Sequence, residues 1–486
     1  MTIAARPIGE RMFSEEDQQR FARLSHDFNP LHMDPVAARR LMTGRQVVHG
    51  IHIVLTGLEF WQSNTNQAPE FIRCTFNNPV SIGDRVVYAQ CDDPGHKTST
   101  VEAAVDGLVC ATFTLVLPGA LQASKPPVAH LPVSDVDLHI PTTFLQALDE
   151  VPEFHQGKAY GLQPDATDLS AYFSNSHRLL GNERLAATLA LSYIVGMVCP
   201  GLHSVFSALN MDLCEKTAGD GLLRFSLRKY DPRFRLFNIC FSGPIDGDIK
   251  AFLRLPVQSQ PSVSDLSSHV LAHEFKGTRT LVIGGSRGLG EITAKILAAG
   301  GGDTVITYAQ GLEDARAIGD EIEAGGAARC QIVRLDLSCD GFDSLPIDWE
   351  TLDAIYFFAT PRIFRKKFNV FDPRLFREFS DFYIVNFYEL CLFLEKTLTT
   401  GRVKVYFPST VFVEARPKGM TEYAMAKSAA EVLIEEINRS FTKLSVLCTR
   451  LPRLSTDQTA SIVKVLTESN VGTLLPLIRR LNGACS

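Results

Sequence analysis

The chain of 486 residues lacks several features that mark whole classes of protein. Its eleven cysteines are scattered and none is spaced as Cys-x-x-Cys, so neither a zinc site nor a disulfide framework is indicated. No uninterrupted apolar run approaches the roughly 20 residues of a membrane span, and the first residues contain no apolar signal core. The net charge of −6 gives no basic surplus for nucleic acid. We therefore expect a cytoplasmic protein with reduced thiols, no metal site, and no nucleic-acid or membrane partner.

The length is too great for one hydrophobic core and suggests about three domains. Two stretches have the composition of linkers, because 117–135 carries four prolines and 255–268 is rich in Pro, Ser and Gln. These linkers predict domains at 1–118, 135–255 and 270–486.

The third segment alternates strand-like apolar runs with stretches of helical period. Such alternation predicts an α/β Rossmann fold, in which a doubly wound parallel sheet carries helices on both faces. The runs are Thr280–Ile283, Thr304–Thr307, Gln331–Leu335, Ala354–Phe358, Val403–Phe407 and Leu444–Cys448.

The first two segments each contain one long helix among strand-like runs. This predicts two similar α+β units, each with a helix wrapped by an antiparallel sheet. The expected elements of the first are a helix over Ile51–Trp61 and strands at Glu70–Phe76, Asp84–Gln90, Thr98–Val105 and Leu108–Val116. Those of the second are a helix near Glu183–Val198 and strands at Ser204–Leu213, Leu222–Lys229 and Leu236–Ser242.

A glycine-rich turn, Gly284-Gly-Ser-Arg-Gly-Leu-Gly290, follows the first strand of the third segment and opens a helix. Gly284 permits a tight turn, Gly288 lets the backbone approach a phosphate, and Gly290 lets helix and strand pack closely. The end of the next strand offers no carboxylate for a ribose 2′-hydroxyl, and Arg287 could attract a 2′-phosphate, so we favour NADP(H). A turn without ligand, and an arginine that merely lies in solvent, remain the alternatives.

Tyr423 and Lys427 are four residues apart and share one face of a helix. A lysine ammonium near the phenol is expected to lower its pKa, and the phenol can then give a proton to an alkoxide as hydride reaches the carbonyl carbon. Thr410 or Ser409, at the end of the preceding strand, could bind the same oxygen, and Asn386 could hold a proton-relay water. In isolation, Tyr-x-x-x-Lys would more often be an exposed helix pair.

In this order, these motifs resemble the short-chain dehydrogenase/reductase family over about residues 276–460. The glycine turn is most similar to that of the 3-oxoacyl-thioester reductases. Departures from the pattern are Ile283 in place of threonine and Phe357-Phe-Ala-Thr360 in place of Asn-Asn-Ala-Gly. The active hydroxyl aligns better with Thr410 than with Ser409. The resemblance implies cofactor contacts from Gly284, Ser286, Arg287, Gly288, Leu289, Gly290, Asp336, Leu337, Ala359 and Lys427.

The first segment contains Asp27-Phe-Asn-Pro-Leu-His32, followed by Val47-Val-His-Gly50 at the start of the long helix. The Asn29-Pro30 turn could let Asp27 and His32 face one spot and share one water molecule. The N–H of Gly50 at the helix N-terminus could polarise a thioester carbonyl. The alternative is that Asp27 and Asn29 only form a loop and that His32 is a buried structural residue.

Together these residues resemble the MaoC-like, (R)-specific enoyl-thioester hydratase/dehydratase family over about residues 10–118. The resemblance implies a hot-dog fold, Asp27 and His32 as the catalytic pair, and a site shaped by Asn29, His49 and Gly50. The middle segment has no such motif and is expected to be a second hot-dog unit, without catalytic residues, that helps to form an acyl-chain tunnel.

Both resemblances point to acyl thioesters, carried by acyl carrier protein or by coenzyme A. The hypothesis is a bifunctional NADPH-dependent 3-oxoacyl-thioester reductase and 3-hydroxyacyl-thioester dehydratase of fatty-acid, polyketide or related acyl biosynthesis, acting as a homodimer. One alternative keeps the hydratase and makes the reductase-like part a cofactor-binding or assembly scaffold. Another is a reductase of a non-thioester ketone joined to an acyl-binding module. The basic stretch Pro361–Ser380 could receive the carrier, or could be a solvated helix face.

Overall fold

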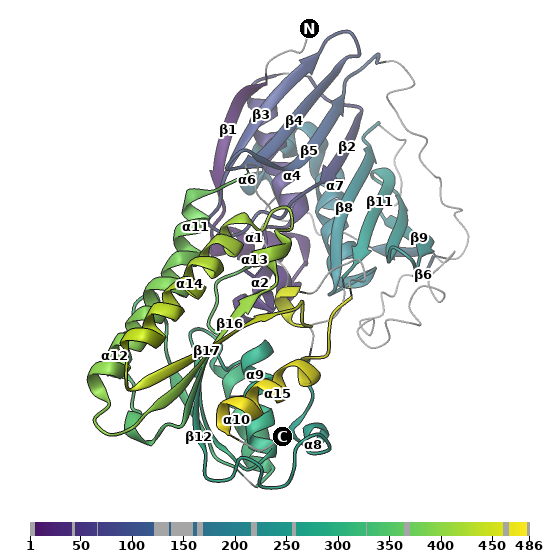
Figure 1. Ribbon diagram of the computed structural model, residues 1–486. Helices are drawn as coiled ribbons and strands as arrows, with labels where there is room; N and C mark the ends of the chain where they lie inside the picture. Colours follow the sequence, from purple (N-terminus) through teal and green to yellow (C-terminus); the bar gives the residue numbers. More distant parts are fainter. Residues whose placement is uncertain are drawn as a thin grey trace. The chain divides into compact units, whose positions relative to one another are not determined.

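The computed structural model describes residues 5–40, 44–65, 67–120, 136–137, 159–162, 169–214, 221–254, 259–326, 328–363, 370–459 and 466–483. The chain divides into two compact units between Pro256 and Val257. The first unit contains an eleven-stranded sheet and the second a six-stranded sheet (Figure 1).

The first half of the first unit wraps five antiparallel strands, in the order β1-β3-β4-β5-β2, around helix α4. Every residue of α4 from Ile51 to Leu58 is buried, as expected for a helix that is apolar on all sides. The elements are β1 (Arg6–Met12), α1 (Glu15–Ser25), α2 (Pro30–Met33), α3 (Pro35–Arg39), α4 (Gly50–Ser63), β2 (Phe71–Phe76), β3 (Arg85–Asp93), β4 (Thr98–Val105) and β5 (Leu108–Val116).

The second half continues the sheet in the order β8-β11-β10-β9-β7-β6 and contributes the long helix α7. Gly181, with φ of 71°, interrupts α7 near its start, and a π-helical turn extends its other end. The elements are β6 (Val136–Asp137), β7 (Ala159–Leu162), α6 (Leu169–Tyr172), α7 (Ser174–Tyr193), η2 (Ile194–Val198), β8 (Ser204–Asp212), β9 (Leu223–Asp231), β10 (Leu236–Ser242) and β11 (Asp246–Leu253).

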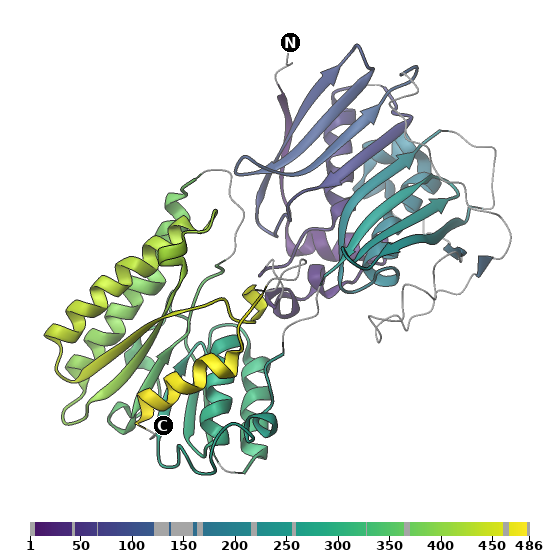
Figure 2. The same ribbon diagram turned by 45° about the vertical axis from the view of Figure 1, so that its right-hand side comes forward.

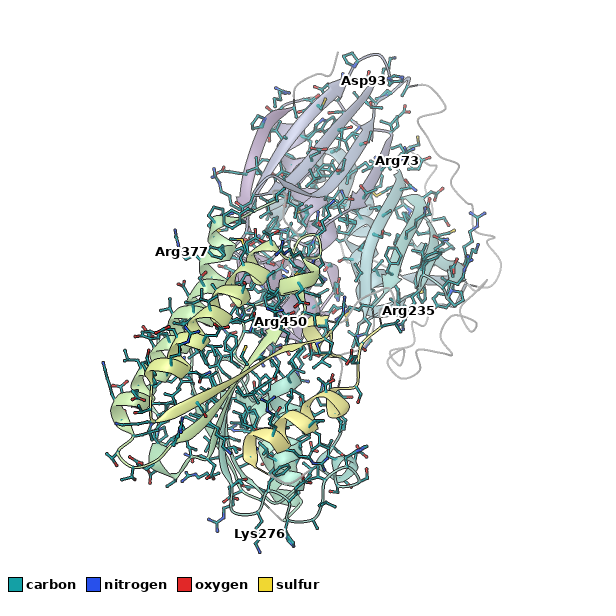
Figure 3. The ribbon with its side chains drawn as sticks, viewed as in Figure 1. Arg73, Asp93, Arg235, Lys276, Arg377 and Arg450 are labelled. Atoms are coloured by element: carbon teal, nitrogen blue, oxygen red, sulfur yellow. The ribbon has the colours of Figure 1, made fainter. Side chains whose placement is uncertain are left out.

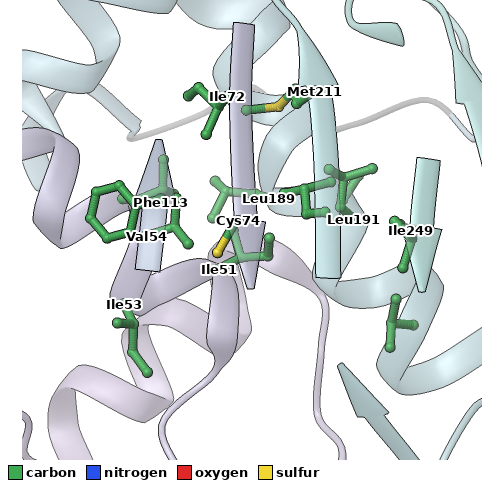
Figure 4. Close-up of a cluster of buried hydrophobic side chains, with 14 of the residues drawn as sticks. Ile51, Ile53, Val54, Ile72, Cys74, Phe113, Leu189, Leu191, Met211 and Ile249 are labelled. Carbon is green, nitrogen blue, oxygen red and sulfur yellow. The ribbon is translucent and has the colours of Figure 1, made fainter. Parts of the chain in front are cut away.

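The two halves are joined by one strand pair and by one core. β2 and β8 pair antiparallel, from Phe71 opposite Asp212 to Thr75 opposite Ala208, and α4 packs against α7. Side chains of both halves meet between the helices and the sheet, as the close-up in Figure 4 shows. The first unit is therefore a double hot-dog with a single continuous interior.

The second unit is a doubly wound sheet in the order β14-β13-β12-β15-β16-β17, in which every neighbouring pair is parallel. The strand order reverses between β12 and β15, and ligands of such sheets bind at the carboxyl ends of the strands at this switch point. The strands are β12 (Arg279–Ile283), β13 (Asp303–Tyr308), β14 (Cys330–Arg334), β15 (Ala354–Phe357), β16 (Val403–Thr410) and β17 (Leu444–Leu451).

Helices cover both faces of this sheet, with α9, α10 and α15 on one side and α11, α12 and α14 on the other (Figure 2). Successive strand residues point to opposite faces, so Leu281 and Ile283 pack in one core and Val282 in the other. The helical elements are α8 (Val263–Leu266), α9 (Gly288–Ala299), α10 (Leu312–Ala324), η3 (Phe342–Ser344), η4 (Trp349–Thr351), α11 (Pro373–Ser380), η5 (Asp381–Val385), α12 (Asn386–Thr397), α13 (Phe412–Ala415), α14 (Thr421–Ser440), η6 (Asp457–Thr459) and α15 (Asn470–Asn482).

The predicted architecture, a double α+β hot-dog followed by a doubly wound α/β sheet, is confirmed. The sequence prediction missed β1, α1 and β11. β1 is largely exposed and gives no alternating pattern, while β11 contains Gly and two Asp, which are depleted in strands. The helix expected from Glu183 begins at Ser174, and the predicted linker 255–268 contains the short helix α8. The predicted linker 117–135 lies almost wholly outside the described residues.

Within the described ranges, no helix is both long and apolar enough to cross a membrane.

Candidate active sites

A short loop after α1 brings Asp27 and His32 together, as the sequence predicts. Asn29 caps α2, since its Oδ1 accepts a hydrogen bond from Leu31 N at 3.0 Å, and Pro30 occupies the first helical position. A carboxylate oxygen of Asp27 and one ring nitrogen each of His32 and His49 all lie within 4.8 Å of one another. The three polar groups therefore converge on one spot.

Backbone carbonyls fix the protonation pattern of the two imidazoles. His32 Nδ1 lies 2.6 Å from Val47 O, and His49 Nε2 lies 3.0 Å from Asp27 O. A carbonyl oxygen only accepts, so each of these nitrogens carries its ring's hydrogen, and His32 Nε2 keeps a lone pair. The two rings stack with centroids 3.8 Å apart. His32 is thus oriented as a base through Nε2.

The carboxylate of Asp27 is buried and hydrogen-bonded on both oxygens. Ser192 Oγ donates to Oδ2 at 2.7 Å, and Asn29 N donates to Oδ1 at 3.2 Å. Burial raises the pKa of Asp27, opposed by His32 and by these donors, and burial lowers the pKa of His32, opposed by Asp27. Both groups are pushed toward their neutral forms, which suits a pair that shares one proton.

The second half of the unit supplies residues to this site that the sequence analysis missed. Ser192 lies on α7, and Gly196 lies in η2 directly against the carboxylate. A Cβ on Gly196 would stand 2.6 Å from Oδ2 of Asp27, and Gly196 O accepts a hydrogen bond from Asn29 Nδ2 at 2.9 Å. The only sequence signal was an otherwise unexplained glycine inside an apolar helical stretch.

Gly50 opens α4 beside the same loop. His49, at the N-cap, makes no side-chain cap hydrogen bond, so no side chain occupies the first N–H groups of the helix. A Cβ on Gly50 would come 2.9 Å from the ring of Phe76, so a larger residue would have to displace that ring. The N–H of Gly50 is therefore placed where it can donate a hydrogen bond to the carbonyl oxygen of a thioester.

Asp27, His32 and His49 also form a donor set of the kind that holds a divalent metal. Each imidazole, however, already directs one ring nitrogen to a backbone carbonyl. The expectation of no metal site stays a prediction.

The glycine turn of the second unit has the geometry of a pyrophosphate cradle. Gly284 and Gly288 have φ of 80° and 59°, a region that favours glycine, and a Cβ on Gly290 would come 2.9 Å from Gly285 Cα. Helix α9 begins without a side-chain cap at Arg287, so its first N–H groups can face an anion. These residues fit the dinucleotide that the fold implies.

The other predicted cofactor residues lie at the same sheet edge. Ala359 follows β15, and its N lies 2.8 Å from where a Cβ of Gly284 would be. After β14, Leu337 O accepts a hydrogen bond from Asn386 Nδ2 at 3.0 Å, and Asp336 Oδ1 accepts one from Ser338 Oγ at 2.6 Å. Within the turn, Ser286 is buried and Leu289 half-buried.

Tyr423 and Lys427 share one face of α14, and both are buried. Thr410 hydrogen-bonds the Tyr423 phenol, whereas Ser409 Oγ donates to Glu431. Arg450, labelled in Figure 3, holds that same carboxylate at 2.6 Å. Both Tyr423 and Glu431 lie on α14, so the two hydroxyls differ in the side chain that each one meets, and Thr410 is the one beside Tyr423.

Lys427 sits in an aromatic cage that the sequence analysis did not foresee. Its Nζ donates to Pro408 O at 2.6 Å and lies 3.8 Å from the ring centroid of Tyr383 and 4.3 Å from that of Phe407. Burial lowers the pKa of Lys427 to about 7. Burial raises the pKa of Tyr423, so the expected lowering of that pKa by Lys427 is not found. Tyr383 lies in the π-helical turn η5, and such turns are frequent at functional sites.

Residues 364–369 of the basic stretch Pro361–Ser380 lie outside the described residues, and they include Arg365, Lys366 and Lys367. Its last part forms α11, which begins at Pro373 with Asp372 as N-cap. The expected docking of a carrier on this stretch stays a prediction.

Comparisons with known proteins agree with the resemblance of the first segment to the MaoC-like family. Residues 3–107 match the family model described as MaoC like domain. The mitochondrial 3-hydroxyacyl-[acyl-carrier-protein] dehydratase of Arabidopsis thaliana is 36% identical over 81 residues, which are 16% of this chain. The chain spans about half (47%) of the length of that curated relative.

Solved structures similar to the chain include two NADP complexes. One is a short-chain dehydrogenase from Burkholderia cenocepacia, 20% identical, with a TM-score of 0.35, covering 43% of this chain and 91% of that one. The other is a 3-oxoacyl (acyl-carrier-protein) reductase from Agrobacterium tumefaciens, 20% identical, with a TM-score of 0.34, covering 42% and 78%.

Proposed function

We propose that the chain is a bifunctional enzyme that reduces 3-oxoacyl thioesters with NADPH and reversibly dehydrates the 3-hydroxyacyl products to trans-2-enoyl thioesters. The observation that carries the proposal is the convergence of Asp27 and His32 within 4.8 Å, with His32 Nε2 available as a base. The match of residues 3–107 to the MaoC like domain supports the same chemistry.

In the hydration direction, His32 Nε2 takes a proton from water as the water oxygen bonds to C3. Protonated Asp27 gives its proton to C2, and transfer of the new proton from His32 to Asp27 restores the pair. The N–H of Gly50 polarises the thioester carbonyl while charge develops on it. Dehydration is the reverse, and each cycle adds or removes one water without net transfer of protons to solvent.

At the second site, the glycine turn of residues 284–290 would hold NADPH, which would supply the hydride. Tyr423 gives its phenolic proton to the substrate oxygen as that oxygen gains negative charge, and Thr410 donates a hydrogen bond to the same atom. Lys427, when charged, favours the phenolate left behind. Asn386 is proposed to hold the water through which the phenol regains its proton.

The thioester carrier is proposed to be acyl carrier protein or coenzyme A. The name of the Arabidopsis relative, an acyl-carrier-protein dehydratase, supports the former. A homodimer and a cytoplasmic location are further predictions that rest on sequence alone.

A coupled assay tests the whole proposal. Purified protein given NADPH and acetoacetyl thioester, either on coenzyme A or on carrier protein, is expected to oxidise NADPH and to yield the crotonyl thioester. Asp27→Asn is expected to stop the sequence at the 3-hydroxy stage. Absence of NADPH oxidation with both carriers would overturn the reductase assignment.

The cage around Lys427 favours a second candidate, in which only the hydratase is active. The Nζ of Lys427 donates to Pro408 O and lies over the ring of Tyr383. These contacts fit a lysine that stabilises the packing of α14 against the sheet. In this case the second unit binds the cofactor, or serves assembly, without turnover. Titration of NADPH fluorescence separates the candidates, since the second predicts saturable binding that acyl thioester leaves unchanged.

A further inference from the structure

Arg254 directly follows β11 in the second half of the first unit. Its backbone N donates to His203 O at 2.9 Å, and its Nη2 donates to Leu202 O at 2.8 Å. Its Nε and Nη1 are buried as well, yet they have no hydrogen-bond partner among the described residues. The guanidinium is thus held at Nη2, and two enclosed nitrogens, Nε and Nη1, are left with N–H groups to donate.

This guanidinium adjoins the Asp27–His32 site. Leu202 O, which accepts from Arg254, also accepts from Asn29 Nδ2 at 3.3 Å, and Asn29 N donates to the Asp27 carboxylate. Arg254 and Asn29 therefore donate hydrogen bonds to the same carbonyl oxygen, that of Leu202. Its positive charge contributes to lowering the pKa of His32 and of His203.

Leaving such buried donors without an acceptor is unfavourable, because they have lost their hydrogen bonds to water. Among the described residues no carboxylate pairs with Arg254, and burial lowers its pKa to about 10. Buried donors without a protein partner call for an acceptor from elsewhere, and the planar guanidinium is suited to an oxygen acceptor. An acyl thioester in the neighbouring site can bring one.

We propose that Arg254 is a substrate-binding residue that donates hydrogen bonds to an oxygen of the acyl thioester close to its reacting carbons. This rests on the proposed hydratase function of the Asp27–His32 site. Two parts of the substrate carry such an oxygen: the first amide of the pantetheine arm, which follows the sulfur after an ethylene linker, and a polar group on the acyl chain. The phosphate at the far end of the arm is too remote from the reacting carbons.

The test measures binding of unreactive saturated thioesters by titration calorimetry, so that it does not depend on turnover. Butyryl-pantetheine carries the arm amide, butyryl ethanethioester lacks it, and glutaryl ethanethioester carries a carboxylate on the chain instead. Arg254→Met keeps much of the aliphatic stem and removes the donors. Arg235→Met is the matched control, because Arg235 lies in the same half and also influences His203 (Figure 3).

Arg254→Met is expected to weaken binding of one amide- or carboxylate-bearing thioester at least tenfold, while Arg235→Met changes it less than twofold. Loss confined to butyryl-pantetheine assigns the arm amide, and loss confined to glutaryl ethanethioester assigns the acyl chain. Equal affinity of wild type and Arg254→Met for all three thioesters overturns the proposal, as does an equal loss for all three. If Arg254→Met does not fold, Arg254→Gln is measured in the same series with the same criteria.

The proposed function fails separately from this inference. Hydration of crotonyl-pantetheine by wild type, and its loss in Asp27→Asn, is measured in parallel. Thioester binding that depends on Arg254 without any hydration would reject the hydratase and keep the binding site.

Discussion

The two candidate sites place their supporting residues at very different distances along the chain. Asp27 and His32 are five positions apart, but the hydroxyl that holds Asp27 comes from Ser192, 165 positions away. In the reductase-like unit, Tyr423, Lys427 and Thr410 lie on an adjoining strand and helix of one sheet. The first site is therefore a local motif that the second half of its unit completes. The catalytic residues of the second site come from β16 and α14, which pack against each other.

The comparison teaches where each site is vulnerable. The first site depends on how α7 and η2 pack against the loop of Asp27, so changes in the half without catalytic residues should reach the chemistry. The second depends on which side chain of α14 each hydroxyl at the end of β16 meets. Substitutions can therefore separate the two sites, and then the residues that support each one.

The largest effects are expected from the reacting groups themselves. Asp27→Asn should lower hydration of crotonyl thioester about 10³-fold, and Tyr423→Phe should lower reduction of acetoacetyl thioester by a similar factor, because each removes a proton-transfer group. Each variant should leave the other activity within twofold in separate steady-state assays. Loss of both activities in one variant would contradict two independent sites.

Gly196→Ala should lower hydration about 10²-fold, because the new methyl group must displace the Asp27 carboxylate. Reduction should be unchanged, and the kinetics should show the loss mainly in kcat. Gly95→Ala, at an exposed turn in the same unit where a Cβ meets only Asp93 at 3.4 Å, is the control. Full hydratase activity in Gly196→Ala would mean that the two halves are not packed as described.

Thr410→Val should lower reduction roughly 10–10²-fold, since it removes the hydroxyl beside Tyr423. Ser409→Ala should change kcat less than threefold, because that hydroxyl is bound to Glu431. Rates with saturating NADPH compare the two directly. The reverse order of effects would assign the active hydroxyl to Ser409.

The smallest effect concerns stability and involves His52, on α4. Burial lowers the pKa of His52 to about 3, so the folded chain keeps it neutral while the unfolded chain protonates it below about pH 6.5. Its stabilising contribution is complete above pH 6.5 and is lost as pH falls toward 3, by about 2 kcal/mol at pH 5. His52→Phe should lessen the loss of unfolding free energy between pH 7 and 5 by that amount. Urea titrations at the two pH values measure it, and an identical pH dependence in both proteins would refute the role.

The sequence predicts those parts of the sites whose geometry is local. Asp27, Asn29 and His32 lie within six residues, so a proline turn is enough to bring them together. The glycine turn is likewise local, because the strand before it and the helix after it are enough to predict a dinucleotide site. Thr410 and Ser409 could not be separated, because both end the same strand and they differ only in the residue of α14 that each one meets, Tyr423 or Glu431.

The residues that support the sites from distant parts of the chain had no comparable signal in the sequence. Ser192, Gly196 and Arg254 acquire their roles only through packing of the second half on the first, and no spacing in the sequence encodes that packing. Tyr383 belongs to no motif of the reductase-like unit, and its position over Lys427 follows from a π-helical turn.

The junction of β2 and β8 has a consequence for biosynthesis. β2 is complete by Phe76 and pairs on one edge with β5, but its partner on the other edge begins at Ser204, so a growing chain carries one unpaired edge of β2 while more than a hundred further residues are added. At about 5–20 residues per second, this interval lasts on the order of ten seconds. During that time the bare edge can join a neighbouring nascent chain, so ribosome-associated chaperones should determine how much of this protein reaches its native form in a cell.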